Sequence, residues 1–490
     1  MANTFGISAY PDVPAILSAL DALIRQPIKR LRRDALNDYL DSYYEKSCPK
    51  SKAMIAEAKS FIPGGVQHNL AFNFPFPLVF TRAEGAYLYD LDGHRYFDFL
   101  QAGGPTVLGS NPPEVRDQVI DLIKTCGPST GLFHEYELKL AKFIAGHMPA
   151  VQMFRMLGSG TEGCMASIRV ARLATGKKNV VKMGGAYHGW SDQLAYGLRI
   201  PGTRHLEAHG VSKHVFKHTQ EFFPGDLDDL ERVLRRNRLS GGTAAVLIEP
   251  VGPESGTRPL PRDFNAGVRK LCDRYGALLI FDEVVTGFRL GLSGAQGYFG
   301  VEPDLTVFGK VVAGGYPSAG GLGGKREYMK LLAAGLEAGQ KKALVGGTMA
   351  ANPLSAAAGY FTLTEMERTR ASEKAGAMGD LLIAGVRESI RRRDLPFVAY
   401  NIGSICHIQT VGTMHFAIDF SKFWRIPGLM KEIKERKIVM EEMGAAYMAE
   451  GIVTLAGSRL YTSAAYNESM IRQAVAAFER VFSDIEGAKA

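Results

Sequence analysis

Five short apolar runs between residues 154 and 308 constrain the fold of this chain more than any other feature. They are Phe154–Leu157, Asn179–Met183, Ala244–Ile248, Ala277–Phe281 and Leu305–Phe308. Helix-length segments separate the runs, and the runs show no alternation of apolar and polar residues. Strands that are buried on both faces have this pattern. The region therefore predicts an α/β fold, with helices on both faces of a parallel sheet.

The sequence on either side of this region predicts a second, smaller α+β domain. Apolar residues recur at helical spacing near the N-terminus, and Asp92-Gly93 separates two strand-like runs, which predicts an antiparallel meander over residues 78–99. Helix-like and strand-like stretches alternate again after about residue 370. We expect an N-terminal helical arm, the first part of the small domain, a large domain and the rest of the small domain. Their expected ranges are 1–50, 51–111, 112–370 and 371–490.

Composition argues against several classes of protein. The net charge of +8 is diffuse, and the basic runs lie among mixed charges at helical spacing, which favours solvated helix faces over nucleic-acid binding. The cysteines show neither a CxxC motif nor a Cys/His spacing, so neither a disulfide framework nor a zinc site is predicted. The start lacks a signal-peptide pattern, and no apolar run reaches membrane-spanning length. We expect a cytoplasmic protein without a nucleic-acid or membrane partner.

A glycine-rich stretch, Gly158-Ser159-Gly160-Thr161-Glu162-Gly163, follows the first run and precedes a predicted helix. Glycines allow close backbone approach, and a helix N-terminus attracts anions. The stretch matches GxGxxG, so a nucleotide-dependent oxidoreductase is a competing hypothesis. Against it, the next strand ends in Lys182-Met183-Gly184-Gly185, without an acidic residue for a ribose hydroxyl. The hydroxyls of Ser159 and Thr161 suit a single terminal phosphate, and a glycine turn without any ligand is the simplest alternative.

Aromatic and acidic side chains follow the second and third runs. Tyr187 and His188 come after the second run, where an aromatic ring can stack on a planar ligand, although such residues are more often structural. Glu249 and Glu254 follow the third run, so two carboxylates are expected at the same edge of the sheet.

An aspartate and a lysine follow the last two runs. Asp282 closes the fourth run, where a buried carboxylate requires a partner such as a heterocyclic N–H, Arg289 or Lys310. Lys310 ends the fifth run. A desolvated amine at that position is less basic and can form a Schiff base, whereas a lysine that begins a loop is simply solvated.

The loop, the aromatic, the aspartate and the lysine each follow a run, at the edge where parallel sheets bind ligands. Together they match the needs of pyridoxal phosphate. The lysine holds the aldehyde as an imine, the aspartate keeps the pyridine nitrogen protonated, and the loop binds the phosphate.

At these residues the chain resembles the class III aminotransferases, which are fold type I pyridoxal-phosphate enzymes, and within them the glutamate-1-semialdehyde aminomutase-like branch. The resemblance covers about residues 50–485. The motifs that carry it are Ile62-Pro63-Gly64-Gly65-Val66, the 158–163 loop, Tyr187-His188-Gly189, Glu249-Pro250, Asp282–Arg289, Pro303–Lys310, Gly346-Gly347-Thr348 and Asn352-Pro353-Leu354-Ser355. It implies a large cofactor-binding domain with a mostly parallel seven-stranded type of sheet and a smaller α+β domain.

The resemblance also implies a role for each site residue. Lys310 would form the Schiff base, Asp282 would meet the pyridinium, and Tyr187 and Val285 would cover the two faces of the ring. Thr348 would complete the phosphate site from the second subunit of a homodimer with shared active sites. The expected catalytic residues are Lys310, Asp282 and Tyr187, and the expected cofactor-binding residues are Ser159, Gly160, Thr161, Tyr187, His188, Glu254, Asp282, Val285, Lys310 and Thr348.

This chain departs from the aminomutase pattern at the substrate end. The aminomutases carry an arginine after the Pro-Gly-Gly-Val stretch, where this chain reads Gln67-His68-Asn69-Leu70-Ala71-Phe72. Glu254 stands where the aminomutases have asparagine and the ω-transaminases of the class have glutamate. Both differences favour an aminotransferase that moves an amino group between an amino compound and a keto acid, or an aldehyde acceptor, in ping-pong half-reactions. An intramolecular aminomutase, a racemase or epimerase on the same scaffold, and a non-catalytic scaffold remain alternatives.

Overall fold

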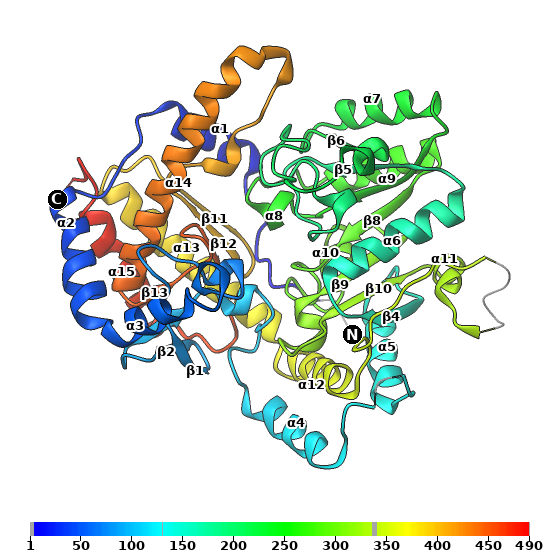
Figure 1. The fold of residues 1–490 in the computed structure, drawn as a ribbon, viewed down its shortest axis with the longest axis horizontal. Helices are drawn as coiled ribbons and strands as arrows, with labels where there is room; N and C mark the ends of the chain where they lie inside the picture. Colours follow the sequence, from blue (N-terminus) through cyan, green and yellow to red (C-terminus); the bar gives the residue numbers. More distant parts are fainter. Residues whose placement is uncertain (1–3, 130, 336–340, 490) are drawn as a thin grey trace. The chain divides into compact units, whose positions relative to one another are not determined.

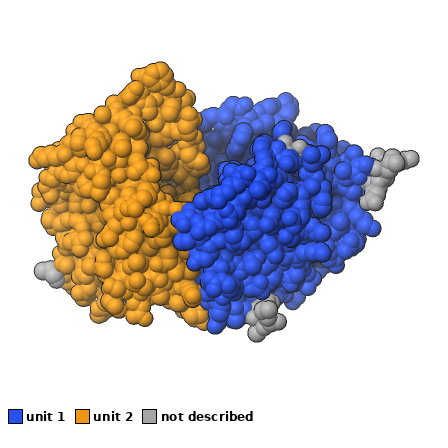
Figure 2. Space-filling model, turned by 90° about the horizontal axis from the view of Figure 1, so that it is seen from below, with its two compact units in different colours: residues 1–6, 113–373, 416–421 blue, residues 7–112, 374–415, 422–490 orange. Residues whose placement is uncertain are grey.

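The computed structural model describes residues 4–129, 131–335 and 341–489 (Figure 1). The chain divides into two compact units, drawn in blue and orange in Figure 2. Unit 1 comprises Met1–Gly6, Pro113–Glu373 and Phe416–Ser421, and unit 2 comprises Ile7–Pro112, Lys374–His415 and Lys422–Ala490. The segment for which a separate N-terminal arm is expected thus lies almost entirely in unit 2.

Unit 1 contains a mixed sheet in the strand order β4-β10-β9-β8-β7-β5-β6. The strands are β4 (Met153–Leu157), β5 (Asn179–Met183), β6 (Thr219–Phe222), β7 (Thr243–Ile248), β8 (Leu278–Asp282), β9 (Leu305–Gly309) and β10 (Gly320–Gly324). All neighbouring pairs are parallel except the two that include β10. In the described part of the chain this is a mostly parallel seven-stranded sheet, so the predicted fold class is confirmed.

Helices cover both faces of this sheet because successive strand residues point to opposite sides. Leu247, Ile280 and Val307 pack against α6, while Val246 and Leu279 pack against α7 and α9. The helices of this unit are α4 (Pro113–Thr125), α5 (Glu135–His147), α6 (Gly160–Thr175), α7 (Leu227–Arg238), α8 (Pro253–Gly256), α9 (Phe264–Tyr275), α10 (Gly294–Phe299), α11 (Arg326–Met329) and α12 (Pro353–Thr369).

The sequence prediction missed β6 and β10, the second of which reads Gly320-Gly321-Leu322-Gly323-Gly324. Glycine disfavours strands, so no local signal marks β10. Its neighbours leave no room for larger side chains. A Cβ on Gly321 would lie 2.5 Å from the Phe154 ring, and one on Gly324 would lie 2.5 Å from Asp304 O. Tertiary packing therefore overrides the local preference.

Unit 2 is an α+β assembly with two sheets in the described residues, ordered β1-β2-β3-β13 and β11-β12-β14. Its strands are β1 (Phe80–Glu84), β2 (Tyr87–Asp90), β3 (Arg95–Asp98), β11 (Val398–Ile402), β12 (Ile405–Gln409), β13 (Ile452–Val453) and β14 (Arg459–Tyr461). The predicted antiparallel meander is β1-β2-β3. The helices are α1 (Val13–Arg25), α2 (Arg33–Asp38), α3 (Pro49–Ala58), α13 (Ala371–Arg392, which begins in unit 1), α14 (Ile426–Ala449) and α15 (Glu468–Ser483).

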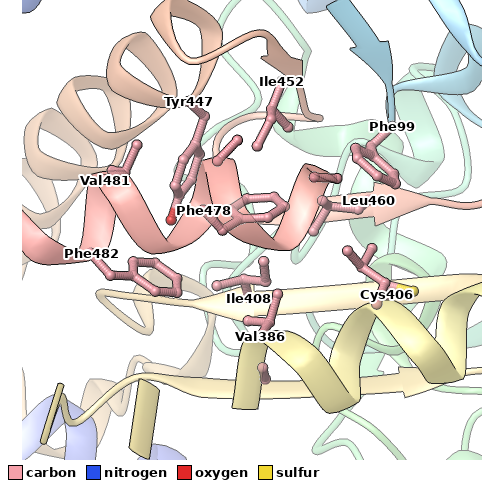
Figure 3. Close-up of a cluster of buried hydrophobic side chains, with 14 of the residues drawn as sticks. Phe99, Val386, Cys406, Ile408, Tyr447, Ile452, Leu460, Phe478, Val481 and Phe482 are labelled. Carbon is pink, nitrogen blue, oxygen red and sulfur yellow. The ribbon is translucent and has the colours of Figure 1, made fainter. Parts of the chain in front are cut away.

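The core of unit 2 lies between its helices and the β11-β12-β14 sheet (Figure 3). Phe478 and Phe482 of α15 and Tyr447 of α14 meet Ile408 and Leu460 of the sheet. Helix α1 forms a separate cluster in the same unit by packing Ile16, Leu20 and Leu23 against Val398 and Tyr400 of β11. None of the described helices combines the length and apolar character that a membrane span requires.

Candidate active site

The predicted site residues follow the carboxyl ends of the unit 1 strands. Strands β9, β8, β7 and β5 are neighbours and parallel, so the residues after them emerge at one edge of the sheet. Strand β4 is antiparallel to β10, which is antiparallel to β9, so β4 also ends at this edge. The glycine loop, Tyr187, Glu249, Asp282 and Lys310 are thereby placed along one edge.

Val284 connects the glycine loop to the strand that carries Lys310. A Cβ on Gly160 would lie 2.7 Å from Val284 Cγ2, and a Cβ on Gly309 would lie 2.8 Å from Val284 Cγ1. The side chain of Val284 therefore occupies the space that these two glycines leave open. The residue before Lys310 and the first residue of α6 thus contact the same side chain.

The glycine loop caps α6, a helix of 16 residues. Ser159 is the N-cap, and its hydroxyl accepts the N–H of Glu162 at 3.2 Å. Thr161 lies directly against Gly189, since a Cβ on that glycine would overlap the threonine hydroxyl. The helix N-terminus and the aromatic turn are therefore in contact, and the positive end of the helix dipole lies at this edge.

Asp282 is buried and receives neutral hydrogen-bond donors. His188 Nδ1 lies 2.7 Å from Oδ2, Cys164 Sγ lies 3.5 Å from the same oxygen, and the N–H of Val284 donates to Oδ1 at 3.0 Å. Burial lowers the pKa of His188 and raises the pKa of the Cys164 thiol well above its usual value, so both donors are uncharged at neutral pH. These three donors hold the carboxyl group in one orientation.

Lys310 begins a short 3₁₀ turn over Lys310–Ala313, directly after β9. It is half-buried, and its φ of 48° is in the left-handed region that non-glycine residues avoid. Such strained backbone is concentrated at functional sites, where the surrounding fold holds it in place. Lys310 thus lies directly after β9, at the edge of the sheet where the other predicted site residues lie, and its role stays a prediction.

Tyr187 and Glu254 are joined through Glu249. The N–H groups of Tyr187 and Glu254 donate to Glu249 Oε1 at 3.0 and 2.8 Å. Glu249 is buried, whereas half of Tyr187 is exposed. The carboxylate thus brings the turn after β5 next to the turn after β7.

Thr348 is exposed and lies in the segment before α12. Its neighbour Gly347 lies beside the start of α6 of the same chain, because a Cβ there would be 3.2 Å from the Glu162 carboxylate. Val285 is half-buried, but the contacts with Gly160 and Gly309 come from Val284. The assignments of Thr348 and Val285 stay predictions.

Sequence reasoning missed the contacts of Val284 and Cys164, and it placed Glu249 at this edge without its links to Tyr187 and Glu254. Val284 lies in the turn after β8 and not in the strand, so strand alternation gives no signal for it. Cys164 comes from the second turn of α6, and only the folded structure brings it to Asp282.

Comparison with known proteins agrees with this geometry. The family model described as aminotransferase class-III matches residues 71–448. The chain belongs to this family. Glutamate-1-semialdehyde 2,1-aminomutase 1 of Lachnoclostridium phytofermentans is 38% identical to it over 377 residues, which are 75% of this chain and 84% of that protein.

Solved structures of transaminases share the fold of this class III enzyme. An ω-transaminase from Sphaerobacter thermophilus is 27% identical, with a TM-score of 0.78 over 90% of this chain and 99% of that one. A β-phenylalanine aminotransferase from Variovorax paradoxus is 26% identical, with a TM-score of 0.77 over 91% of this chain and 96% of that one. The predicted family and fold type are confirmed.

Class III aminotransferases use pyridoxal phosphate, and the donor set of this class III enzyme fits that cofactor. Asp282 is a buried carboxyl group that His188 Nδ1 and Cys164 Sγ hold in place, as a partner of a protonated pyridine nitrogen must be. His188 Nε2 is buried without a hydrogen-bond partner among the described residues. One polar atom beside Asp282 can therefore still accept a partner. The predicted cofactor is confirmed at the level of the family.

Proposed function

We propose that this enzyme is an aminotransferase that moves an amino group between an amino compound and a keto acid. The observation that carries the proposal is the packing of Val284 against both Gly160 and Gly309. Val284 lies in the turn after Asp282, so this packing sets the phosphate-type loop and the residue before Lys310 against that turn and supports the proposal. The cofactor of the family can be held and used only where these groups meet.

Each predicted site residue would have its own role in holding and using the cofactor. Ser159, Gly160 and Thr161 would hold the phosphate at the positive end of α6. Tyr187 would stack on one ring face, Val284 or Val285 would cover the other, and Asp282, oriented by His188, would hold the ring nitrogen in its protonated form. When bound, pyridoxal phosphate supplies an aldehyde that takes up the amino group and a ring that stabilises negative charge. Lys310 Nζ would anchor the cofactor and move the proton at the substrate carbon.

An intramolecular aminomutase is the second candidate, because the relative that is 38% identical over most of both chains bears that name. The two functions differ in one respect. An aminotransferase needs a separate keto acid to complete its cycle, whereas an aminomutase returns the amino group to the same molecule.

A homodimer is the finer part of the proposal. Large apolar side chains are exposed in and between α4 and α5 of unit 1, with Phe133 76% exposed and Leu132 72% exposed. Apolar side chains gathered in this way mark interaction surfaces. The exposed Thr348 is accessible to a second copy of the chain, as its expected role in a shared site requires.

The proposal predicts a specific dependence on Lys310 and on the acceptor. With an amino compound alone, the enzyme should form about one equivalent of keto product per subunit and then stop, and an added α-keto acid should restore turnover. Lys310→Ala should reduce the rate by roughly 10³-fold or more. Borohydride should attach the cofactor covalently to Lys310, which peptide mass mapping would detect.

Lys330→Ala serves as the matched control, because Lys330 is an exposed lysine of unit 1, and this variant should keep activity and borohydride capture. Steady conversion of one amino compound into its isomer without acceptor would instead establish the aminomutase. Full activity of Lys310→Ala would refute both functions.

A further inference from the structure

The peptide group between Ala186 and Tyr187 is held at both polar ends by buried ionisable side chains. Lys182 Nζ donates to Ala186 O at 2.8 Å, and the N–H of Tyr187 donates to Glu249 Oε1 at 3.0 Å. Lys182 is 0% exposed and Glu249 is 5% exposed. Because this C=O and N–H belong to one planar amide, the two contacts together fix its orientation. The Cα of Tyr187 is a member of that plane.

Glu249 also holds the turn that carries Glu254. Its Oε1 accepts the N–H of Glu254, and its Oε2 accepts both the N–H and the hydroxyl of Ser255, the latter at 3.0 Å. Glu254 and Ser255 have φ values of 43° and 51°, in the left-handed region. The carboxyl group of Glu249 thus receives four donors from two loops, and it holds a turn whose backbone is strained.

Lys182 closes the other side of the same loop. Its ammonium also donates to Tyr196 O at 2.6 Å, so it ties residue 186 to residue 196 across the loop after β5. Burial lowers the pKa of Lys182 to about 8, while the nearby carboxylates of Glu221 and Glu249 act in the opposite direction. Removing the Lys182 ammonium from water costs free energy. Its hydrogen bonds offset part of that cost, and they fix the conformation of the loop.

Packing alone does not hold the Tyr187 ring, since half of this residue is exposed. The ring position must therefore depend on the backbone that carries it. We propose that Lys182 and Glu249 form a clamp on the 186–187 peptide, and that this clamp positions the Tyr187 ring, and with it Glu254, for the bound cofactor. The inference rests on the proposed function, because it assigns a purpose to the placement of Tyr187.

The test compares the affinity of the apoenzyme for pyridoxal phosphate in four proteins: wild type, Glu249→Gln, Tyr187→Ala and the double variant. The amide of Glu249→Gln retains the shape of the side chain but cannot accept on both of its ends. We expect its Kd for pyridoxal phosphate to rise about 10-fold, with a changed circular dichroism band of the bound cofactor. In the Tyr187→Ala background the same substitution should change Kd by less than about 2-fold, because the ring that it positions is gone.

Asp304→Asn is the matched control for damage to a buried carboxylate. Asp304 is also buried and accepts the N–H of Leu279 and Arg269 Nη1, each at 2.8 Å, but it lies at the amino end of β9, away from the site. The Asp304→Asn substitution should lower the melting temperature of the protein without changing the circular dichroism band of the bound cofactor. Ser255→Ala removes one donor of Glu249 and should raise Kd about 2- to 3-fold even if Glu249→Gln folds poorly.

Two outcomes would overturn the clamp. One is an unchanged Kd in both Glu249→Gln and Ser255→Ala, and the other is an equal rise in Kd with and without the Tyr187 ring. Failure of the proposed function is distinguishable from both. An aminomutase would turn over without an added keto acid, and a protein that does not use the cofactor would show no borohydride capture at Lys310.

Discussion

At the scale of single residues, the site depends on side chains that fill space left by glycines. Val284 is the clearest case, because its two methyl groups face Gly160 and Gly309. The backbone of the phosphate-type loop and that of the strand before Lys310 can approach only because neither glycine carries a Cβ. One valine therefore sets the spacing between the groups that would hold the two ends of the cofactor.

Comparison of Val284→Ala with Val285→Ala decides which valine covers the ring. Val284→Ala should raise the Kd for pyridoxal phosphate about 10-fold, which corresponds to roughly 1.4 kcal/mol, because it removes contacts with both neighbouring backbones. Val285→Ala should change Kd by less than about 3-fold. Titration of each apoenzyme, followed by absorbance, measures both values, and the reverse order would return the role to Val285.

At the scale of elements, β10 shows how a strand can be required by its neighbours alone. It pairs with both β4 and β9, so it connects the strand before the glycine loop to the strand before Lys310. A Cβ on Gly320 would overlap the backbone of Ser159, and one on Gly323 would lie 2.8 Å from Val151 Cγ1. The run of glycines permits β10 to pack against the phosphate-type loop.

Gly320→Ala should therefore destabilise the protein by about 1–3 kcal/mol, because the clash is with backbone and no side-chain rotation relieves it. The substitution should also weaken phosphate binding, since Ser159 must move. Gly146→Ala is the control: nothing lies within 4 Å of its Cβ, and α5 is helical at this position, so it should be neutral or slightly stabilising. Urea denaturation of the two variants gives the comparison, and equal stability would contradict the packing argument.

At the scale of the whole molecule, the open question is which subunit supplies Thr348. The resemblance assigns Thr348 to the active site of a second subunit, whereas Gly347 lies beside Glu162 of its own chain. In either arrangement the Thr348 hydroxyl can donate to the phosphate. The two arrangements differ only in whether it does so in its own subunit or in the second subunit.

Hybrid dimers distinguish the two arrangements. A Lys310→Ala subunit paired with a Thr348→Ala subunit retains one complete site if the threonine acts across the interface, and none if it acts within its own chain. We expect the co-expressed hybrid to recover activity that both parent variants lack, approaching half of the wild-type rate, since one of two sites is intact. Tandem affinity purification isolates the hybrid, and the absence of recovery would place Thr348 in its own subunit's site.

The sequence predicted the large sheet well because its evidence is local. The runs that became β4, β5, β7, β8 and β9 are mostly apolar, and each is followed by a predicted site residue. Strands β6 and β10 were missed for opposite reasons: β6 reads Thr-Gln-Glu-Phe, with polar residues that suit an edge, and β10 is mostly glycine. In the second domain the sequence predicts a helical stretch near residues 427–436, and in the structure the helix at that position, α14, continues to Ala449.

By itself, the sequence determined the class of fold, the order of the site motifs and the cofactor, because these depend on periodicity and on residue types at strand ends. Only the tertiary structure decided how the motifs touch. Cys164 and His188 meet at Asp282, Glu249 links Tyr187 to Glu254, and Val284 lies between two glycines. Residues that are distant in the chain make these contacts, and their distances depend on the packing of whole strands and helices, which no local pattern encodes.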